Sequence, residues 1–243
     1  MFSVIRSEWY KLRKTRILSL LFVGPMVGLF IGLTTNNDNL GGEINQWYTK
    51  LLFMNLTYSL LFLPLITGVF ASMICRYEHQ AGGLKQLLAL PVTRGQVFAA
   101  KYILVIGLVM VIQLLYLVSI VLVGMIAGID DPFPMEIVWK SIFGGWVATL
   151  PLVALQLWMS MLFKSFAAPF AVNVIFTLPT IMVVNSEKIG PYYPWAQPFS
   201  MMYISDNTND LFFVPWDQLL IVVGGSFLLF FVCGYLYFQR KPV

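Results

Sequence analysis

Six long apolar runs divide the chain, and polar or turn-rich segments separate them. A helix rises about 1.5 Å per residue, so about 20 residues cross the roughly 30 Å hydrocarbon core of a bilayer. None of the six runs has a charged residue in its interior. We therefore predict an all-α integral membrane protein with six transmembrane helices. The predicted spans are residues 17–34, 51–75, 102–128, 141–163, 167–184 and 217–238.

Residues 1–16, which precede the first run, have an amphipathic helical pattern. One helical face carries Phe2, Ile5, Trp9 and Leu12. The basic residues of the segment, which fall mostly elsewhere, are Arg6, Lys11, Arg13, Lys14 and Arg16. This pattern predicts an interfacial helix that rests on anionic lipid. The first run is too long for a signal peptide and has no small-residue cleavage site after it, so we expect it to be retained.

The composition places the whole chain in a membrane. Hydrophobic residues make up 59% of the 243 residues and charged residues 11%, whereas about 25% of the residues in soluble domains are charged. No repeat, low-complexity tract or soluble domain interrupts the pattern. We therefore predict that residues 1–243 form a single transmembrane domain.

The basic residues indicate an orientation, because segments rich in Lys and Arg stay in the cytoplasm. With the N-terminus inside, 12 of the 15 Lys and Arg residues fall in cytoplasmic segments, and 9 of the 11 acidic residues fall outside. An even number of spans places both termini in the cytoplasm. The net charge of +4 follows from this topology, so it does not indicate a nucleic-acid partner.

The longest cytoplasmic loop, residues 76–101, is predicted to contain a short helix. Leu84, Leu87 and Leu88 recur at the i, i+3, i+4 spacing of one helical face, and Pro91 ends the pattern. Such a helix either lies in the lipid interface or presses its leucines into a partner protein, and the pattern alone leaves both open.

A second helix is predicted to begin near Arg94 and to run into the third span. Thr93 and Gln96 have the spacing of a capping box, with Thr93 as the N-cap. Val92 and Val97 have the spacing of a hydrophobic staple across the same helix start. The cytoplasmic loop therefore ends at a defined helix N-terminus.

The stretch EHQAGGLKQLLALPVTR, from Glu78 to Arg94 and followed by Lys101, resembles the loop after the second span in ABC-2-type transporter permeases. Six spans, cytoplasmic termini and a basic N-terminal helix agree with that family. Within the family, the short length of the chain and the sequence of the loop resemble those of permeases that protect Gram-positive bacteria against lantibiotics and related peptide antibiotics. The implied location is the bacterial plasma membrane.

The resemblance implies that the loop carries a coupling helix, which docks on a separate ATPase subunit. Two ATPase copies and two permeases, identical or related, form such a transporter. The leucines would fill a groove of the ATPase. Charge-assisted hydrogen bonds from Glu78, Lys85 and Arg94 would fix the orientation of the coupling helix in that groove. The glycines would allow a bend or close backbone approach, or form a plain turn. The candidate coupling residues are Glu78, Gly82, Gly83, Leu84, Lys85, Leu87, Leu88, Pro91 and Arg94.

In the resembling family, the N-terminal interfacial helix lies at the cytosolic entrance and gates it. The candidate gate residues here are Trp9, Lys11, Arg13 and Lys14. They carry the aromatic and basic side chains that an interfacial helix needs.

The first span has small residues at four-residue spacing, and the fifth contains Asn173. Gly24, Gly28 and Gly32 let another helix approach closely, either within the chain or across a seam between two permeases. The resemblance places the first and fifth spans near that seam. Asn173 either lines the transport path or bonds across helices.

Residues 185–216, in the last outer loop, contain the aromatic stretches GPYYPWAQPFSMMYI and LFFVPW. Amphipathic aromatic rings gather at a membrane boundary. Short re-entrant helices shielded by protein explain the segment, and so does an aromatic belt around an irregular loop.

The sequence lacks the G-x-x-x-x-G-K-[ST] loop that holds ATP phosphates. A permease of this kind must borrow its ATPase, so we predict that ATP and Mg²⁺ are bound by the partner. This chain is then not an enzyme by itself, and we expect no catalytic residue, cofactor or metal site in it. The predicted function is export of a hydrophobic or amphipathic substrate, with an antimicrobial peptide as the leading cargo.

Several alternatives stay open. An ABC exporter whose cargo is a lipid or a drug has the same sequence features. So has a non-transporting subunit that senses a peptide. An ion-coupled secondary transporter usually places ionisable residues inside its spans, and the predicted spans have none. An intramembrane enzyme is disfavoured because H-E-x-x-H and G-x-S-x-G are absent and the single histidine, His79, lies in the cytosolic loop.

Overall fold

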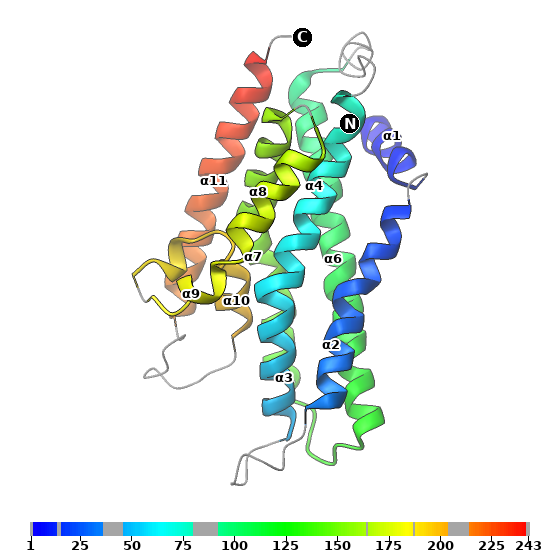
Figure 1. Ribbon diagram of the computed structural model, residues 1–243, viewed down its shortest axis with the longest axis vertical. Coiled ribbons are helices and arrows are strands. Elements are labelled where there is room, and N and C mark those ends of the chain that lie inside the picture. The colour runs from blue at the N-terminus through cyan, green and yellow to red at the C-terminus, as the bar shows by residue number, and fades with distance from the viewer. Residues whose placement is uncertain are drawn as a thin grey trace.

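The computed structural model describes residues 2–13, 16–35, 46–79, 92–163, 165–186, 188–203 and 214–241. Within these ranges the chain is a bundle of helices without strands (Figure 1). Both termini lie at one end of the bundle, here called the terminal end, and the opposite end is called the far end. The helices are α1 (Phe2–Arg13), η1 (Arg16–Phe22), α2 (Val23–Thr34), α3 (Gln46–Thr57), η2 (Tyr58–Phe62), α4 (Leu63–His79), α6 (Arg94–Ala127), α7 (Met135–Leu162), α8 (Ala167–Thr177), α9 (Thr180–Val183), η3 (Gly190–Tyr192), α10 (Gln197–Met202) and α11 (Trp216–Arg240).

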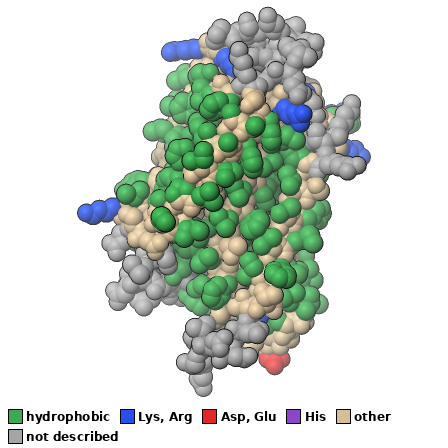
Figure 2. Space-filling model, viewed as in Figure 1, with side chains coloured by type: hydrophobic (Ala, Val, Ile, Leu, Met, Phe, Trp, Pro, Cys, Tyr) green, Lys and Arg blue, Asp and Glu red, His purple; other side chains and the backbone are tan. Residues whose placement is uncertain are grey.

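Among the described residues, five helical segments are long and apolar enough to cross a membrane. They match the predicted spans one, two, three, four and six. The segments are Ile17–Thr34, Gln46–Arg76, Arg94–Ala127, Met135–Leu162 and Trp216–Arg240. Hydrophobic side chains cover the face seen in Figure 2 along the height of the bundle, and most of the basic side chains visible there lie near the terminal end.

The predicted fifth span is a shorter apolar segment, Ala167–Val183, that α8 and α9 share. Pro179 separates the two helices, because a proline has no N–H to donate and its ring crowds the preceding turn. The structure therefore supports five full-length spans, and the count of six stays a prediction.

The second span changes its winding in the middle. η2 is one turn of π-helix between α3 and α4, and Pro64 is the second residue after it. In a regular α-helix, the N–H of residue 64 would bind the carbonyl of Leu60, but a proline cannot donate this bond. Wide π-turns often mark functional positions in helices.

The first span packs closely against its own chain through its glycines. A Cβ atom on Gly28 would lie 2.6 Å from the ring of Tyr116, and one on Gly24 would lie 2.8 Å from the ring of Tyr58. Gly32 meets side chains of α3 and α6 in the same way. The small-residue face of α2 is thus occupied by α3, η2 and α6 of the same molecule. The two tyrosine rings that fill it stack on each other with centroids 3.9 Å apart.

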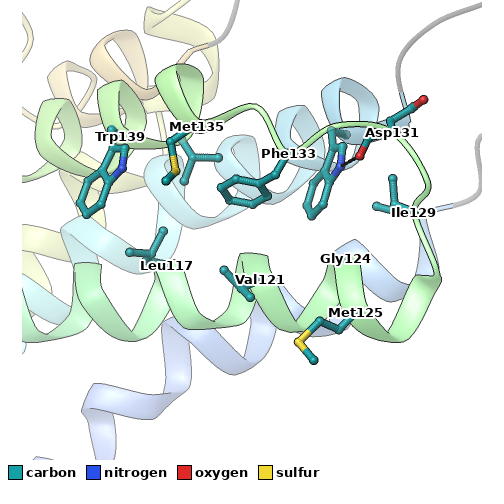
Figure 3. A pocket seen from close by; sticks show the side chains of 11 residues that line it. Leu117, Val121, Gly124, Met125, Ile129, Asp131, Phe133, Met135 and Trp139 are labelled. Carbon is teal, nitrogen blue, oxygen red and sulfur yellow. Dashed lines mark hydrogen bonds between the residues drawn. The ribbon is translucent and has the colours of Figure 1, made fainter.

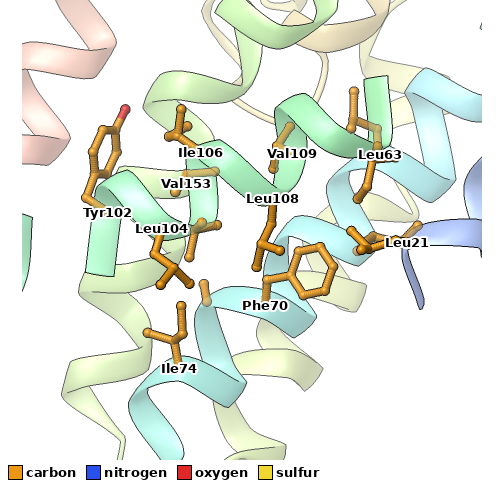
Figure 4. Packing of buried hydrophobic residues seen from close by; sticks show 14 of the residues in the cluster. Leu21, Leu63, Phe70, Ile74, Tyr102, Leu104, Ile106, Leu108, Val109 and Val153 are labelled. Carbon is orange, nitrogen blue, oxygen red and sulfur yellow. The ribbon is translucent and has the colours of Figure 1, made fainter. Parts of the chain in front are cut away.

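The main core lies between α4, α6 and α7. Figure 4 shows Leu63 and Phe70 of α4 beside Leu108 and Val109 of α6, with Leu21 of η1 at the edge. These side chains are buried. α6 also packs against α1, α2 and α11, so it forms the centre of the bundle.

The short helices of the last outer loop lie beside the bundle. α10 packs against α7 and η2, and Figure 1 shows α9 and α10 at the height of α3, above the far-end tips of α3 and α6. Trp195, Phe199, Met201 and Met202 are buried there. Residues 188–203 of the loop thus contain two short helices, η3 and α10, joined by turns, and several of their side chains are packed against the bundle. Such a position supports the re-entrant interpretation, which itself stays a prediction.

Candidate functional site

Helix α1 is packed onto the terminal end of the bundle by one face. Its buried residues are Val4, Glu8 and Leu12, spaced four apart, whereas 40% of Trp9 is exposed. Of the predicted apolar face, Leu12 is buried in the bundle, whereas Trp9 stays on the outer side, so contact of this face with lipid stays a prediction. The acidic residue Glu8 occupies the centre of the buried stripe and finds partners there.

Three charged side chains, here called the anchor cluster, join α1 to α6. They are Glu8, Lys11 and Lys101. The ammonium of Lys101 donates to Glu8 Oε2 at 2.8 Å and to the carbonyl of Ile74 in α4 at 3.0 Å. Lys11 donates to the other oxygen of Glu8. Glu8 is 1% exposed and Lys101 is fully buried, so their buried ion pair and the bond from Lys101 to Ile74 tie α1, α4 and α6 together.

The anchor cluster keeps Glu8 ionised. Burial by itself would raise the pKa of the Glu8 carboxyl, because it penalises the charged form. The charge of Lys101 and the hydrogen bonds from Lys101 and Lys11 outweigh burial and hold this pKa below its usual value. Removing one partner from such a pair leaves an uncompensated buried charge, which typically costs about 3–5 kcal/mol.

Sequence reasoning missed this cluster, although two signals were present. Glu8 falls between Val4 and Leu12 on one helical stripe, and Lys101 falls two turns inside the helix that begins at Arg94. Lys101 precedes the predicted third span, residues 102–128, but it belongs to the same helix and is buried. An acid on an apolar stripe and a base inside a buried helix each require a buried partner.

Most candidate coupling residues lie outside the described residues, namely Gly82, Gly83, Leu84, Lys85, Leu87, Leu88 and Pro91. Glu78 belongs to the last turn of α4, and its side chain is not described. The predicted capping box is confirmed, since the Thr93 side chain accepts from the Gln96 N–H and the Gln96 side chain accepts from the Thr93 N–H. Helix α6 begins at Arg94, as predicted.

The two flanks of residues 80–91 are fixed to different parts of the bundle. On one side, the Ile74 carbonyl of α4 accepts a hydrogen bond from Lys101, and Lys101 also binds Glu8 of α1. On the other side, Arg94 donates to the carbonyls of Phe238 and Gln239 at the end of α11. Unpaired carbonyls at a helix C-terminus attract cations, which explains this contact. The helices on the two sides of residues 80–91 are thereby joined to α1 and to α11.

The candidate gate residues lie on the outer side of α1. Trp9 and Arg13 are exposed, and Lys11 is half-buried because it binds Glu8. Lys14 lies outside the described residues. The exposed part of α1 thus carries aromatic and basic groups, as an interfacial helix does.

Two clusters of neutral polar side chains lie inside the bundle. In the first, Asn55 of α3 donates to Ser141 Oγ at 2.9 Å and to the Met202 carbonyl at 3.0 Å. Tyr116 donates to the Asn55 side-chain oxygen at 2.9 Å. This cluster ties α10 and α7 to the centre of the bundle and sits one turn before η2.

The second cluster is built on Asn173, which is 2% exposed. Its side-chain oxygen accepts from Gln156 and from the indole of Trp195, both at 2.7 Å, and its amide donates to the Pro64 carbonyl at 3.0 Å. Asn173 therefore bonds across four segments of the bundle: α4, α7, α8 and the turn before α10. The two clusters lie on either side of η2. The first contains Asn55, in the turn before η2, and the second binds the carbonyl of Pro64, just after η2.

These clusters are neutral, and they do not form a binding site for a metal. Among the residues that the structure describes, no group of three His, Cys, Asp or Glu side chains is arranged to hold a metal ion. The buried base Lys50 is also used internally, since its ammonium donates to the Gly32 and Thr35 carbonyls at the end of α2. The described polar groups of the spans hold helices together and leave little that resembles an ion-coupling site.

Comparison with known proteins identifies the class of this bundle. The sequence model of a family described as ABC-2 family transporter protein matches residues 4–180, from α1 to the start of α9. The bacitracin transport permease protein BCRB of Bacillus licheniformis is 26% identical over 181 residues, which cover 72% of this chain and 83% of that protein. The matched region includes the anchor cluster and the helices on both sides of residues 80–91.

Proposed function

We propose that this chain, which belongs to the ABC-2 transporter family, pairs with a second permease and two ATPase subunits to export an amphipathic peptide from the membrane. Membership makes the chain a multi-pass membrane permease and a non-catalytic part of an ATP-binding cassette transporter. The cargo, the partners and their numbers are the proposed part. The name of the relative supports an antibiotic as cargo.

One observation carries the coupling mechanism: Lys101, fully buried, binds both Glu8 of α1 and the Ile74 carbonyl of α4. Residues 80–91 connect α4 to α6, so a partner that pushes on this loop acts on the two helices that the lysine joins. ATP binding closes the two ATPase subunits, and their approach moves the docked loop. Because α1 is locked to the same lysine, the interfacial helix moves together with the core helices.

The second span provides a point where that movement can be absorbed. The backbone hydrogen bonds of η2 have the wider π spacing and Pro64 cannot donate one, so side chains of the two polar clusters add contacts on both sides of this turn. A π-turn next to a proline is a common position for a helix to bend. We infer that α3 and α4 pivot there, so that the two halves of the span change their angle during transport.

The proposed class of cargo follows from the chemistry of the side chains in the described spans. The described spans carry neutral amides, hydroxyls and aromatic rings, and their buried bases are bound to carbonyls or to Glu8. In the described spans, the buried bases already bind groups of the protein itself. An amphipathic peptide, which prefers a mixed apolar and polar surface, suits such spans, and lipid or drug cargo is the competing outcome of the test below.

The experiment is co-purification of the tagged protein after expression with its neighbouring genes, followed by mass spectrometry and an ATPase assay. We expect an ATPase subunit at one copy per permease. Changing Leu87 and Leu88 together to Asp should abolish the association, since it places charge on the proposed docking face. The matched control changes both leucines to Met and keeps the face apolar, so it should retain the ATPase.

Cargo is tested with the purified complex in proteoliposomes. Bacitracin and cationic amphipathic peptides should raise the ATPase rate, whereas added short-chain lipid should not. Normal ATPase association in the Asp variant would refute the docking assignment. Stimulation by lipid alone would replace the peptide with a lipid as the proposed cargo.

A further inference from the structure

We propose that a groove at the far end of α6 and α7 is a binding site for a cationic amphiphile, with the apolar chain along α6 and the positive group at Asp131. The groove encloses about 600 Å³, within the range of about 300–1,000 Å³ that small-molecule sites occupy. It is separate from the anchor cluster and from both polar clusters. Its use for loading cargo rests on the proposed function, but its ability to bind does not.

The groove lies between the last turns of α6 and the start of α7. Figure 3 shows Val121 and Met125 on the α6 side and Met135 and Trp139 on the α7 side, with Phe133 reaching in from the connecting segment. Trp47, from the first turn of α3, closes one end. Apolar and aromatic side chains therefore make up most of the walls.

The end wall is held in place before any ligand binds. The indole N–H of Trp47 donates to the Asp131 carbonyl at 3.0 Å, and its ring meets Phe133 edge to face at 5.0 Å. A Cβ atom on Gly124 would lie 2.1 Å from the Trp47 ring, so only a glycine lets this ring rest on α6. Contacts from three segments thus preform the pocket, which reduces the entropy lost on binding.

The length of the groove matches one leaflet of a membrane. Its lining on α6 begins at Leu117, ten residues before the helix ends at Ala127, which corresponds to about 15 Å. Half of a hydrocarbon core of about 30 Å has the same depth. Val121 and Met125 are 41% and 75% exposed, so the groove is open to lipid at the side. A chain from the far-end leaflet can enter without crossing the protein.

The charge at the surface end is negative. Among the described residues that line the groove, Asp131 is the only charged one, and its carboxylate accepts from the Gln46 N–H at 2.9 Å. Nearby described bases have other partners: Lys140 binds Glu136 at 2.6 Å, and Lys50 binds carbonyls of α2.

Two further features of the same end favour a positive group. The C-terminus of α6, which carries partial negative charge, points to this end of the groove. The faces of Trp47, Phe133 and Trp139 attract cations as well as apolar chains. A cationic amphiphile satisfies both the apolar walls and the negative end, whereas an anionic one meets only repulsion at Asp131.

The test uses two photoactivatable twelve-carbon chains that differ only in the head group, trimethylammonium or sulfate. The protein is placed in nanodiscs of zwitterionic phosphatidylcholine, so that the membrane itself does not select a charge. After irradiation, the labelled peptides are identified by mass spectrometry. We expect saturable labelling of residues 117–139 by the ammonium probe, at least tenfold above the sulfate probe at equal concentration.

Two matched pairs of variants test the location. Val121→Trp should fill the groove and cut labelling of residues 117–139 about tenfold. Its control, Val118→Trp, makes the same change on the same helix at a residue that is 53% exposed and outside the groove, and it should leave labelling unchanged. Gly124→Ala should displace Trp47 and weaken labelling, whereas Gly107→Ala meets nothing within 4 Å and should not.

The charge is tested by Asp131→Asn, which should reduce the preference for the ammonium probe about three- to fivefold, as expected for a partly exposed ion pair. Equal labelling by both probes would overturn the cationic assignment. Even labelling of all lipid-facing helices, or equal effects of the two Trp variants, would overturn the site. The measurement needs neither ATP nor a partner, so a wild-type protein that co-purifies with no ATPase would refute the proposed function and leave this inference standing.

Discussion

The ion pair between Glu8 and Lys101 should make a large and non-additive contribution to stability. Glu8→Gln removes the carboxylate that binds the fully buried ammonium of Lys101 and leaves the bond of this ammonium to the Ile74 carbonyl. Lys101→Met leaves a buried carboxylate that still has Lys11. Because breaking a buried pair costs about 3–5 kcal/mol, we expect about 5 kcal/mol for the first change and about 3 kcal/mol for the second.

The double variant should be much more stable than the sum of the two single variants. It removes both charges together, and replacing a buried pair by neutral groups of similar volume is often close to neutral. We therefore expect a coupling free energy of at least about 3 kcal/mol in the double-mutant cycle. The cycle reports the pair itself, because each single variant retains the shape of the side chain.

The assay is equilibrium unfolding of the purified protein in mild detergent by titration with sodium dodecyl sulfate, followed by tryptophan fluorescence. The matched control is the pair Glu136 and Lys140 of α7, which has the same two residue types at 2.6 Å but is exposed. The corresponding Gln and Met variants of this pair should not change the midpoint measurably. If the anchor variants behave like the control, or if the double variant costs the sum of the singles, the anchor cluster does not hold α1 on the bundle.

Two further predictions follow from the same contacts. Because the pKa of Glu8 is lowered in the folded state, its contribution to stability is complete above the ordinary value of 4.5 and is lost as pH falls through the lowered pKa. The difference in free energy of unfolding between the wild-type protein and Glu8→Gln should therefore be constant well above pH 4.5 and shrink as the pH falls below 4.5, and a constant difference throughout would contradict the ion pair. Gly28→Ala should cost about 1–3 kcal/mol by overpacking against Tyr116, measured as a lower unfolding midpoint, whereas Gly107→Ala, with nothing within 4 Å, should cost almost none.

Local patterns in the sequence predicted the local parts of the fold. The capping box of Thr93 and Gln96 is a relationship between residues three positions apart, so the sequence contains all of it. The apolar runs likewise predicted five spans that are long enough to cross a membrane. The fifth run also is apolar, but Pro179 divides it into two short helices, an effect that average hydrophobicity does not register.

The parts that depend on distant partners were not predictable in this way. Asn55 and Ser141 are 86 positions apart, and Gly124 accommodates a ring that belongs to Trp47. A single sequence indicates that such residues need partners, since buried polar groups are bonded, but it does not say which. The interpretation of Asn173 stayed open for the same reason until its four partners were seen.

The basic residues that indicated the topology also have a structural role that explains their positions. Arg94 and Lys241 bind carbonyls at or near the ends of α11 and α7, and Lys101 binds one in the last turns of α4. All three helices end at the terminal end of the bundle. A cation that caps a helix C-terminus lies at the end of the bundle where that helix finishes. Capping and the predicted preference of basic residues for the cytoplasm therefore place bases at the same end of the bundle.

The same argument applies at the far end, where α2 finishes and Lys50 caps it. Lys50 lies in a predicted outer segment, against the general preference of basic residues for the cytoplasm. Its contacts instead show that it serves a helix end, like the bases at the opposite face. The positions of Arg94, Lys101, Lys241 and Lys50 therefore follow from the direction of the helices whose carbonyls they bind, and their value as topological signals follows from the number of helices that end on each side.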